Sequence, residues 1–233
     1  MKISVFSIPE LKPGKYNIKD ARLDDVDKLV KAKKKTYVQA ELVGEDSVFE
    51  ADSVLTLSDS AADLVLRDLE FVETRLGRAA DEKEKALLNK LKAALEKEEF
   101  VFKAALTPEE KQSMASYSMV TMKPVVVAKK EELEDTNALL ARALKESGYT
   151  SFFTAGEKET RAWLIKQGAT AWEAAGAIHS DIQKGFIRAE IIPLNDYLSA
   201  GGETQAKQAG KLRVEQKDYV MQEGDLANFR FNK

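Results

Sequence analysis

The chain has 233 residues, of which 44% are hydrophobic and 32% are charged, and its formal net charge is −3 at pH 7. This composition is typical of a soluble protein with room for more than one core. Cys is absent and His occurs once, which excludes disulfides, thiolate nucleophiles and multi-His metal centres. The negative net charge argues against a protein that is basic over its whole surface.

Membrane insertion and secretion are not expected from the sequence. No apolar run is long enough to cross a bilayer, and no charged segment followed by an apolar one opens the chain. We therefore expect a cytoplasmic protein with no membrane partner.

The first third of the chain has the pattern of an α/β region. Apolar residues alternate over residues 1–6 and 36–43, as in half-buried strands, residues 53–57 form another strand-like run, and residues 21–32 have a helical apolar face. That helix leads into the basic run Lys31-Ala-Lys-Lys-Lys35. Such a run suits either a solvated helix end or a contact with nucleic acid.

The middle of the chain is helical. Apolar residues repeat at spacings of three and four in two stripes: Ala61, Val65, Leu69, Val72 and Leu76, then Leu88, Leu91 and Leu95. Two such stripes separated by residues 77–81 predict an antiparallel helical hairpin. Thr107 and Pro108 predict a further helix start. A buried strand over 123–128 and a helix over 133–147 follow.

The last third has the pattern of a small α+β domain. Phe186–Ile192 alternates apolar and polar residues, and residues 219–221 and 227–231 form two more strand-like runs. Thr170 is placed to cap a short helix ending at Ile178. Short strands around one short helix predict a ubiquitin-like fold. Trp163 and Trp172 are both interpreted as core residues.

Several strings of this last third occur in the same order in a known family. They are Thr154-Ala-Gly-Glu-Lys-Glu159, Arg161-Ala-Trp163, Gly185-Phe-Ile-Arg-Ala-Glu190, Gly201-Gly-Glu203, Ala209-Gly-Lys211 and Phe229-Arg-Phe231. They closely resemble the C-terminal TGS domain of the YchF (Obg-like ATPase) family. The rest of the chain is similar to the same family in abridged form.

The resemblance implies a fold that combines α/β and α+β parts. Residues 1–57 and 120–150 would form a reduced, P-loop-like α/β remnant of a G domain. Residues 58–119 would be an inserted antiparallel helical hairpin, similar to the family's coiled coil but shorter. Residues 151–233 would be the ubiquitin-like β-grasp (TGS) domain, which we expect to fold on its own.

The resemblance also implies a nucleotide site, whose motifs are altered here. Gly14-Lys15 stands where the family's G-x-x-x-x-G-K-[ST] loop ends, but Tyr16 replaces the hydroxyl that binds Mg²⁺, and Pro13 lacks an N–H donor. The alternative interpretation of Gly14-Lys15 is a polar turn between a strand and a helix.

The two other nucleotide motifs are altered as well. Glu41-Leu-Val-Gly44 stands in place of D-x-x-G, and Lys129-Lys-Glu-Glu132 stands where a base-recognising Asn is expected. We therefore expect Gly14, Lys15, Glu41 and Gly44 to form at most a relic site for weakly bound ATP or GTP with Mg²⁺. No catalytic residue and no metal ligand are predicted.

The family resemblance implies nucleotide hydrolysis, ribosome association and a role in translation. Because phosphate, Mg²⁺ and base recognition are all altered, the sequence favours a non-catalytic binding or regulatory protein that acts through its TGS domain on the ribosome, RNA or a protein. The alternative is an ATP- or GTP-binding protein with weak or partner-dependent activity. An unrelated enzyme is a third hypothesis, resting on His179 beside Ser180 and Asp181, although neighbours in sequence rarely form a triad.

The partner surface is expected on the C-terminal domain. Lys and Arg equal Asp and Glu in number over residues 151–233, so binding to RNA requires a local basic patch. Candidates for that patch are Lys158, Arg161, Lys184 and Arg188. Arg188 is also placed to pair with Glu190 instead.

Overall fold

A computed structural model describes residues 1–232 and divides the chain into two compact units. The N-terminal unit comprises Met1–Tyr16 and Ala40–Ser147, and the C-terminal unit joins Asn17–Gln39 to the residues from Gly148 onward. Residues 17–39 and 148–150, which the sequence placed in the first region, therefore lie in the second. The rest of the three-part division stays a prediction, and its last residue, Lys233, lies outside the described residues.

The first sheet has five strands in the order β2-β4-β1-β5-β6. Their bounds are Lys2–Phe6 (β1), Gly14–Ile18 (β2), Val38–Val43 (β4), Ser53–Leu57 (β5) and Val125–Ala128 (β6). β1 runs parallel to β4 and β5, and β5 runs parallel to β6. The first four residues of β5 are buried, as expected for an inner strand of a parallel sheet.

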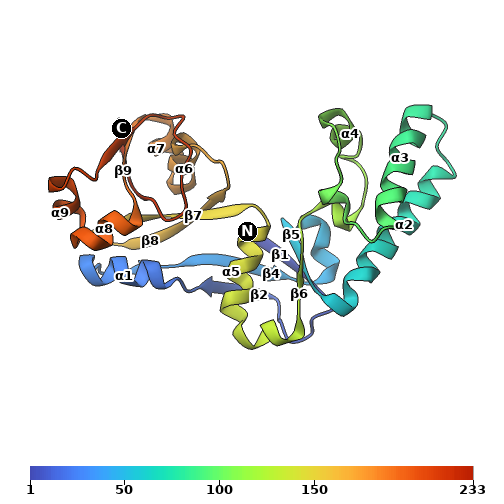
Figure 1. Cartoon of the computed structure of the whole chain (residues 1–233), viewed down its shortest axis with the longest axis horizontal. Helices are drawn as coiled ribbons and strands as arrows, with labels where there is room; N and C mark the ends of the chain where they lie inside the picture. Colours follow the sequence, from blue (N-terminus) through green and yellow to red (C-terminus); the bar gives the residue numbers. More distant parts are fainter. Residues whose placement is uncertain (233) are drawn as a thin grey trace. The chain divides into compact units, whose positions relative to one another are not determined.

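Two helices of the N-terminal unit, α2 (Ala61–Leu76) and α3 (Glu82–Leu95), lie side by side in Figure 1. Leu64 of α2 and Leu88 of α3 are fully buried in one apolar cluster. The Glu73–Lys92 ion pair, at 2.7 Å, links the exposed sides of the same two helices. The apolar stripes seen in the sequence thus face each other.

The remaining elements of this unit are short. The helices are α4 (Pro108–Ser113) and α5 (Thr136–Glu146), and the 3-10 turns span Glu45–Glu50, Ser58–Ser60, Val101–Lys103, Val120–Met122 and Lys130–Asp135. The expected start of α4 is confirmed, because Thr107 and Glu110 form a reciprocal capping box with Pro108 in the first turn.

The second sheet has six strands in the order β10-β9-β11-β7-β8-β3. Their bounds are Lys35–Thr36 (β3), Tyr149–Ala155 (β7), Thr160–Lys166 (β8), Phe186–Ile192 (β9), Arg213–Glu215 (β10) and Leu226–Phe231 (β11). The strand expected at residues 219–221 is wrong, because Val220 makes only an isolated bridge to Thr170. The backbone of its neighbours bonds instead to Ala169 and Ala171, at the start of α6.

Helices cover both faces of this sheet. They are α1 (Ala21–Val30), α6 (Ala171–Ile178), α7 (Ser180–Lys184), α8 (Leu194–Ala200) and α9 (Glu203–Gln208). Phe152 and Phe153 are neighbours on β7 and point to opposite faces. Phe152 is buried in one cluster with Ala174 of α6, whereas Phe153 lies under the guanidinium of Arg22 on α1. Figure 1 shows α1 and α6 on opposite sides of the strands.

The expected cap of α6 is confirmed. The Thr170 hydroxyl accepts from the Glu173 N–H, and the Glu173 carboxylate accepts from the Thr170 N–H. Trp163 packs against the core as expected. Trp172 is 45% exposed, so its assignment to the core is wrong. Within residues 1–232, none of the helices is both long enough and apolar enough to cross a membrane.

Candidate functional site

The carboxyl end of β1 is where a ligand is expected in a parallel sheet of this kind. Ser7 follows β1 in the left-handed region, with φ 54°. Its N–H donates to Oε1 of Glu45 over 2.8 Å. A carboxylate therefore occupies the backbone donor that lies at this end of β1, and its negative charge disfavours a phosphate there.

The residues expected to form a phosphate-binding loop, Gly14 and Lys15, lie in a strand and are not followed directly by a helix. Gly14 and Lys15 are exposed and begin β2, a strand of the same sheet. They form neither the expected loop nor the alternative turn between a strand and a helix. A phosphate loop needs a helix directly after its Lys, so that the helix N-terminus faces the anion, but α1 begins only at Ala21.

The four residues predicted as a relic nucleotide site lie on or beside the paired strands β2 and β4, but within residues 1–232 no ion pair joins Lys15 to Glu41. Glu41 stands opposite Lys2, at the amino end of β1. Gly44 follows β4, and its carbonyl accepts from the Ser4 hydroxyl over 3.3 Å. Gly14 and Lys15 lie on β2, which pairs with β4 and not with β1.

The segment after Gly44, which includes the 3-10 turn Glu45–Glu50, is held by a lysine. The Lys123 ammonium donates to the carbonyls of Val48, Phe49 and Ala51 over 2.7, 2.6 and 2.6 Å. Burial lowers the pKa of Lys123 from its ordinary value. Three charge-assisted bonds and the Ser7–Glu45 contact fix both ends of this segment to the sheet.

The residues at the expected base-recognition motif serve internal contacts. The Glu132 carboxylate accepts from the Lys129 N–H over 2.8 Å and pairs with Arg142 at 3.0 Å. Arg142 also donates to the Val127 carbonyl. These groups cap a 3-10 turn and fasten α5 to β6, so they are not placed to read a purine.

His179 has a local role. Its Nδ1 accepts from the Asp181 N–H over 3.1 Å, which caps the short helix α7. The imidazole and the Asp181 carboxyl are both largely exposed. No nucleophile is hydrogen-bonded to this His within residues 1–232, so the triad interpretation gains no support.

The predicted basic patch of the C-terminal unit is divided by the sheet. Arg161 pairs in register with Thr154 and lies on the Phe152 face, where its guanidinium stacks 3.9 Å from the Trp163 ring centroid. Arg188 projects from the opposite face. The candidate residues on β8 and β9 therefore do not form one patch.

Arg188 pairs with Glu190, as the sequence suggested, and Arg230 binds the same carboxylate, which the sequence did not suggest. The buried Glu190 carboxylate accepts from Arg230 over 2.8 Å and from Arg188 over 3.2 Å. The hydrogen bond from Arg230 lowers the pKa of Glu190 below its ordinary value, and the bond from Arg188 adds a smaller effect in the same direction. Arg230 was missed because only the register of β11 against β9 places it opposite Arg188.

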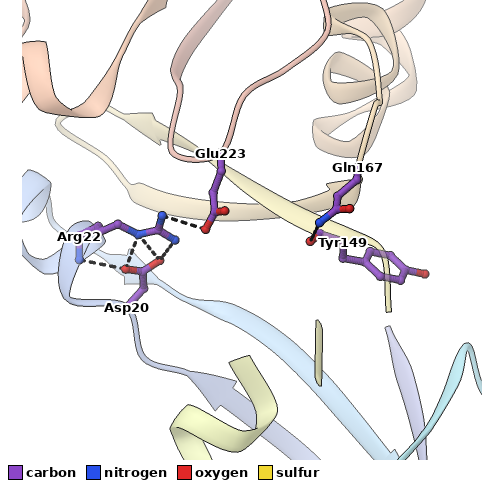
Figure 2. A network of polar contacts seen from close by, with 5 residues as sticks. All are labelled: Asp20, Arg22, Tyr149, Gln167 and Glu223. Atoms are coloured by element: carbon purple, nitrogen blue, oxygen red, sulfur yellow. Dashed lines mark hydrogen bonds and ion pairs between the residues drawn. The ribbon is translucent and has the colours of Figure 1, made fainter. Parts of the chain in front are cut away.

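A polar network fastens α1 to the C-terminal sheet (Figure 2). Asp20 caps α1 by accepting from the Arg22 N–H, and it also receives two arms of the Arg22 guanidinium. The third arm reaches Glu223 over 3.0 Å, in the turn before β11. Where β7 begins and β8 ends, the Gln167 side-chain amide donates to the Tyr149 carbonyl over 3.4 Å.

Comparison with known proteins gives a consistent result. The family model described as YchF-GTPase_C, Protein of unknown function (DUF933), matches residues 149–232. The "Ribosome-binding ATPase YchF" of Bacillus subtilis is 34% identical over 235 residues, covering 73% of this chain and 64% of that protein. The chain belongs to the YchF/Obg-like ATPase family.

Other YchF proteins match a shorter stretch of the chain. The "Ribosome-binding ATPase YchF" of Haemophilus influenzae is 56% identical over 82 residues, which is 35% of this chain and 23% of that protein. The chain thus spans less than two thirds of the length of either YchF relative.

The YchF fold extends over the whole chain. The "Structure of the Schizosaccharomyces pombe YchF GTPase" has a TM-score of 0.78 and 18% identity, covering 99% of this chain and 97% of that one. At this identity the match establishes the shared fold alone. The mixed α/β architecture with two sheets described above is therefore similar to that of this YchF GTPase.

A nucleotide with Mg²⁺, the ligand that the YchF resemblance implied, does not fit the residues at the carboxyl end of β1. Glu45 occupies the Ser7 N–H, and Lys15 lies on β2, which β4 separates from β1. Across the described part of the chain, no group of three or more acidic or His side chains is arranged to hold a metal ion.

Proposed function

We propose that this chain is a non-catalytic YchF-like protein that associates with the ribosome through its C-terminal, TGS-like unit. The observation that carries the proposal is the carboxylate of Glu45 on the Ser7 N–H at the end of β1. It places negative charge where a nucleotide's phosphates would have to lie. The Lys123 bonds add support, because a segment fixed at several carbonyls is a poor switch.

The C-terminal unit supports a binding role. Its sheet is continuous over six strands, and the YchF C-terminal family model matches residues 149–232 within it. Structured RNA outside the ribosome, or a protein, would fit the same unit. We place the protein's action in translation, in the cytoplasm, with the α2–α3 pair as a shortened version of the family's coiled-coil hairpin.

A second candidate function is ATP or GTP binding with weak or partner-dependent hydrolysis. It is favoured by the 34% identity to a protein named an ATPase over 73% of this chain. Binding would require the Ser7–Glu45 contact to open and β2 to leave its place in the sheet. Glu41 and Gly44 would then have to join Gly14 and Lys15.

Ribosome association is expected to be independent of nucleotide. Sedimentation of the protein with purified ribosomes through a sucrose cushion should give the same bound fraction with ATP, with GTP and without nucleotide. Binding only in the presence of one nucleotide would favour the second candidate. An absence of binding under all three conditions would contradict the ribosomal partner.

A further inference from the structure

The basic run Lys31–Lys35 lies against the β7–β8 turn, although more than a hundred residues separate them in sequence. β3 is the edge strand beside β8, and it pairs Lys35 with Thr160 and Thr36 with Arg161. The Lys33 N–H donates to the Glu157 carbonyl over 3.0 Å, and the Thr160 N–H donates to the Lys34 carbonyl over 2.9 Å. Two basic groups that the sequence treated separately are therefore neighbours.

Several of these cations are free of carboxylate partners. Lys35 is engaged by Asp24 at 2.6 Å, and Lys34 by Glu159 at 3.2 Å. Within residues 1–232, the exposed ammonium groups of Lys31, Lys33 and Lys158 have no ion pair. Their charge is therefore available to a ligand.

The remaining groups at this edge leave it positive. The Arg161 guanidinium is held against Trp163 and keeps its charge. The acids of the β7–β8 turn are Glu157 and Glu159, whereas Asp24 and Asp27 of α1 pair with Lys35. Thr36, and then Lys34 and Arg161, lower the pKa of Glu159, so this carboxylate stays ionised. Lys31, Lys33, Lys34, Lys158 and Arg161 together still outnumber the two acids.

The N-terminal segment also makes the C-terminal unit basic as a whole. Residues 17–39 contain seven Lys and Arg against four Asp, whereas residues 148–233 contain eleven of each sign. The remainder of the chain, which forms the N-terminal unit, has an excess of acidic residues. The segment that completes the sheet is thus the segment that supplies the excess positive charge.

We propose that Lys31, Lys33, Lys34, Lys158 and Arg161, here named the basic edge, bind the phosphate backbone of RNA. This inference rests on the proposed function, in which the C-terminal unit contacts the ribosome. RNA phosphates are recognised by clustered, unpaired Lys and Arg side chains, and their neutralisation makes binding salt-dependent. The cations on α7 and β9, Lys184 and Arg188, lie outside this edge.

The test compares two triple variants with equal net charge. K31Q/K33Q/K158Q removes three unpaired cations of the basic edge. The control K83Q/K97Q/K111Q removes three exposed lysines of the N-terminal unit that are likewise without ion pairs in the described structure. A fluorescent RNA hairpin is titrated with each protein over a series of KCl concentrations, and sedimentation with ribosomes is measured in parallel.

The basic-edge variant should bind the hairpin more weakly at low salt, and the slope of log affinity against log salt should fall by about three, at roughly 0.9 per lost phosphate contact on a duplex. The control should keep the slope of the parent protein. Equal slopes in the two variants would overturn the basic edge. A slope lost only in K184Q/R188Q would move the site to β9 and overturn it as well.

Three further outcomes separate the basic edge from the proposed function. A parent protein that binds neither RNA nor ribosomes contradicts the proposed function itself. A parent that binds ribosomes but not the hairpin, with binding lost in K31Q/K33Q/K158Q, indicates a ribosomal protein as the partner and overturns the RNA proposal. A basic-edge variant that aggregates but binds as the parent does would assign these lysines to protection of the β3 edge.

Discussion

A fragment of residues 151–233 is expected to unfold without a sharp transition, which reverses the expectation from the sequence that this stretch folds on its own. The fragment lacks α1, which covers the face of β7 and β8 where Phe153 is fully buried. It also lacks β3 and the first two residues of β7. Exposing an aromatic side chain of this kind costs about 1.5–3 kcal/mol, a large part of a small domain's stability.

Complementation with a peptide of residues 17–39 tests the cause. Added to residues 148–233, the peptide should restore a cooperative thermal transition, followed by the fluorescence of Trp163 and Trp172. A peptide with both Arg22→Ala and Leu23→Ala should not, because Arg22 bridges Asp20 to Glu223 and Leu23 is fully buried. A sharp, peptide-independent transition of the fragment alone would show that α1 is dispensable.

Replacing Asp68 by Ala is expected to destabilise the N-terminal unit by about 3 kcal/mol, since each unsatisfied buried group costs roughly 1–3 kcal/mol. Asp68 lies on α2 and is completely buried. Its carboxylate accepts from the Val120 and Thr121 N–H groups over 2.8 and 2.7 Å. The substitution leaves both donors without a partner in the core and releases the turn before β6 from α2.

Unfolding in urea, followed by far-UV circular dichroism, measures this loss. Glu70→Ala, on the exposed side of the same helix, is the matched control and should change stability by less than about 0.5 kcal/mol. Both tryptophans lie in the C-terminal unit, so their fluorescence reports the other unit separately. Equal effects of the two substitutions would contradict a structural role for the buried carboxylate.

The same carboxylate predicts a pH dependence. Burial raises the pKa of Asp68 above its ordinary value, against the opposing effect of its hydrogen bonds. Because the folded state then holds the proton more tightly, the contribution of Asp68 to stability falls as pH rises from the unfolded to the folded pKa. The stability difference between the parent protein and Asp68→Ala should therefore shrink over this acidic window as pH rises.

Local signals predicted much of the fold. Alternation identified β1 and β9, a strand-like run identified β5, and the capping residues Thr107 and Thr170 identified the starts of α4 and α6. These elements depend on residues close in sequence, and the structure confirms them. The assignment of residues 17–39 failed because it depends on pairing across the chain, between β3 and β8 and between Arg22 and Glu223.

For the candidate site too, the sequence predicted local features but not the contacts between residues far apart in the chain. The sequence identified weakened motifs around Gly14 and Gly44, but it did not predict that Glu45 bonds the Ser7 N–H or that Lys123 holds three carbonyls. Both contacts join residues far apart in sequence. The basic patch was likewise predicted by residue type, while its division between β8 and β9 follows only from strand order.

The central claim is that the N-terminal unit does not hold a nucleotide tightly, and isothermal titration with ATP and with GTP in the presence of Mg²⁺ tests it most directly. With the Glu45 carboxylate on the Ser7 N–H and Lys15 on β2, titration of micromolar protein should give no heat beyond dilution. A micromolar or tighter dissociation constant for either nucleotide, lost in Lys15→Ala, would contradict the account.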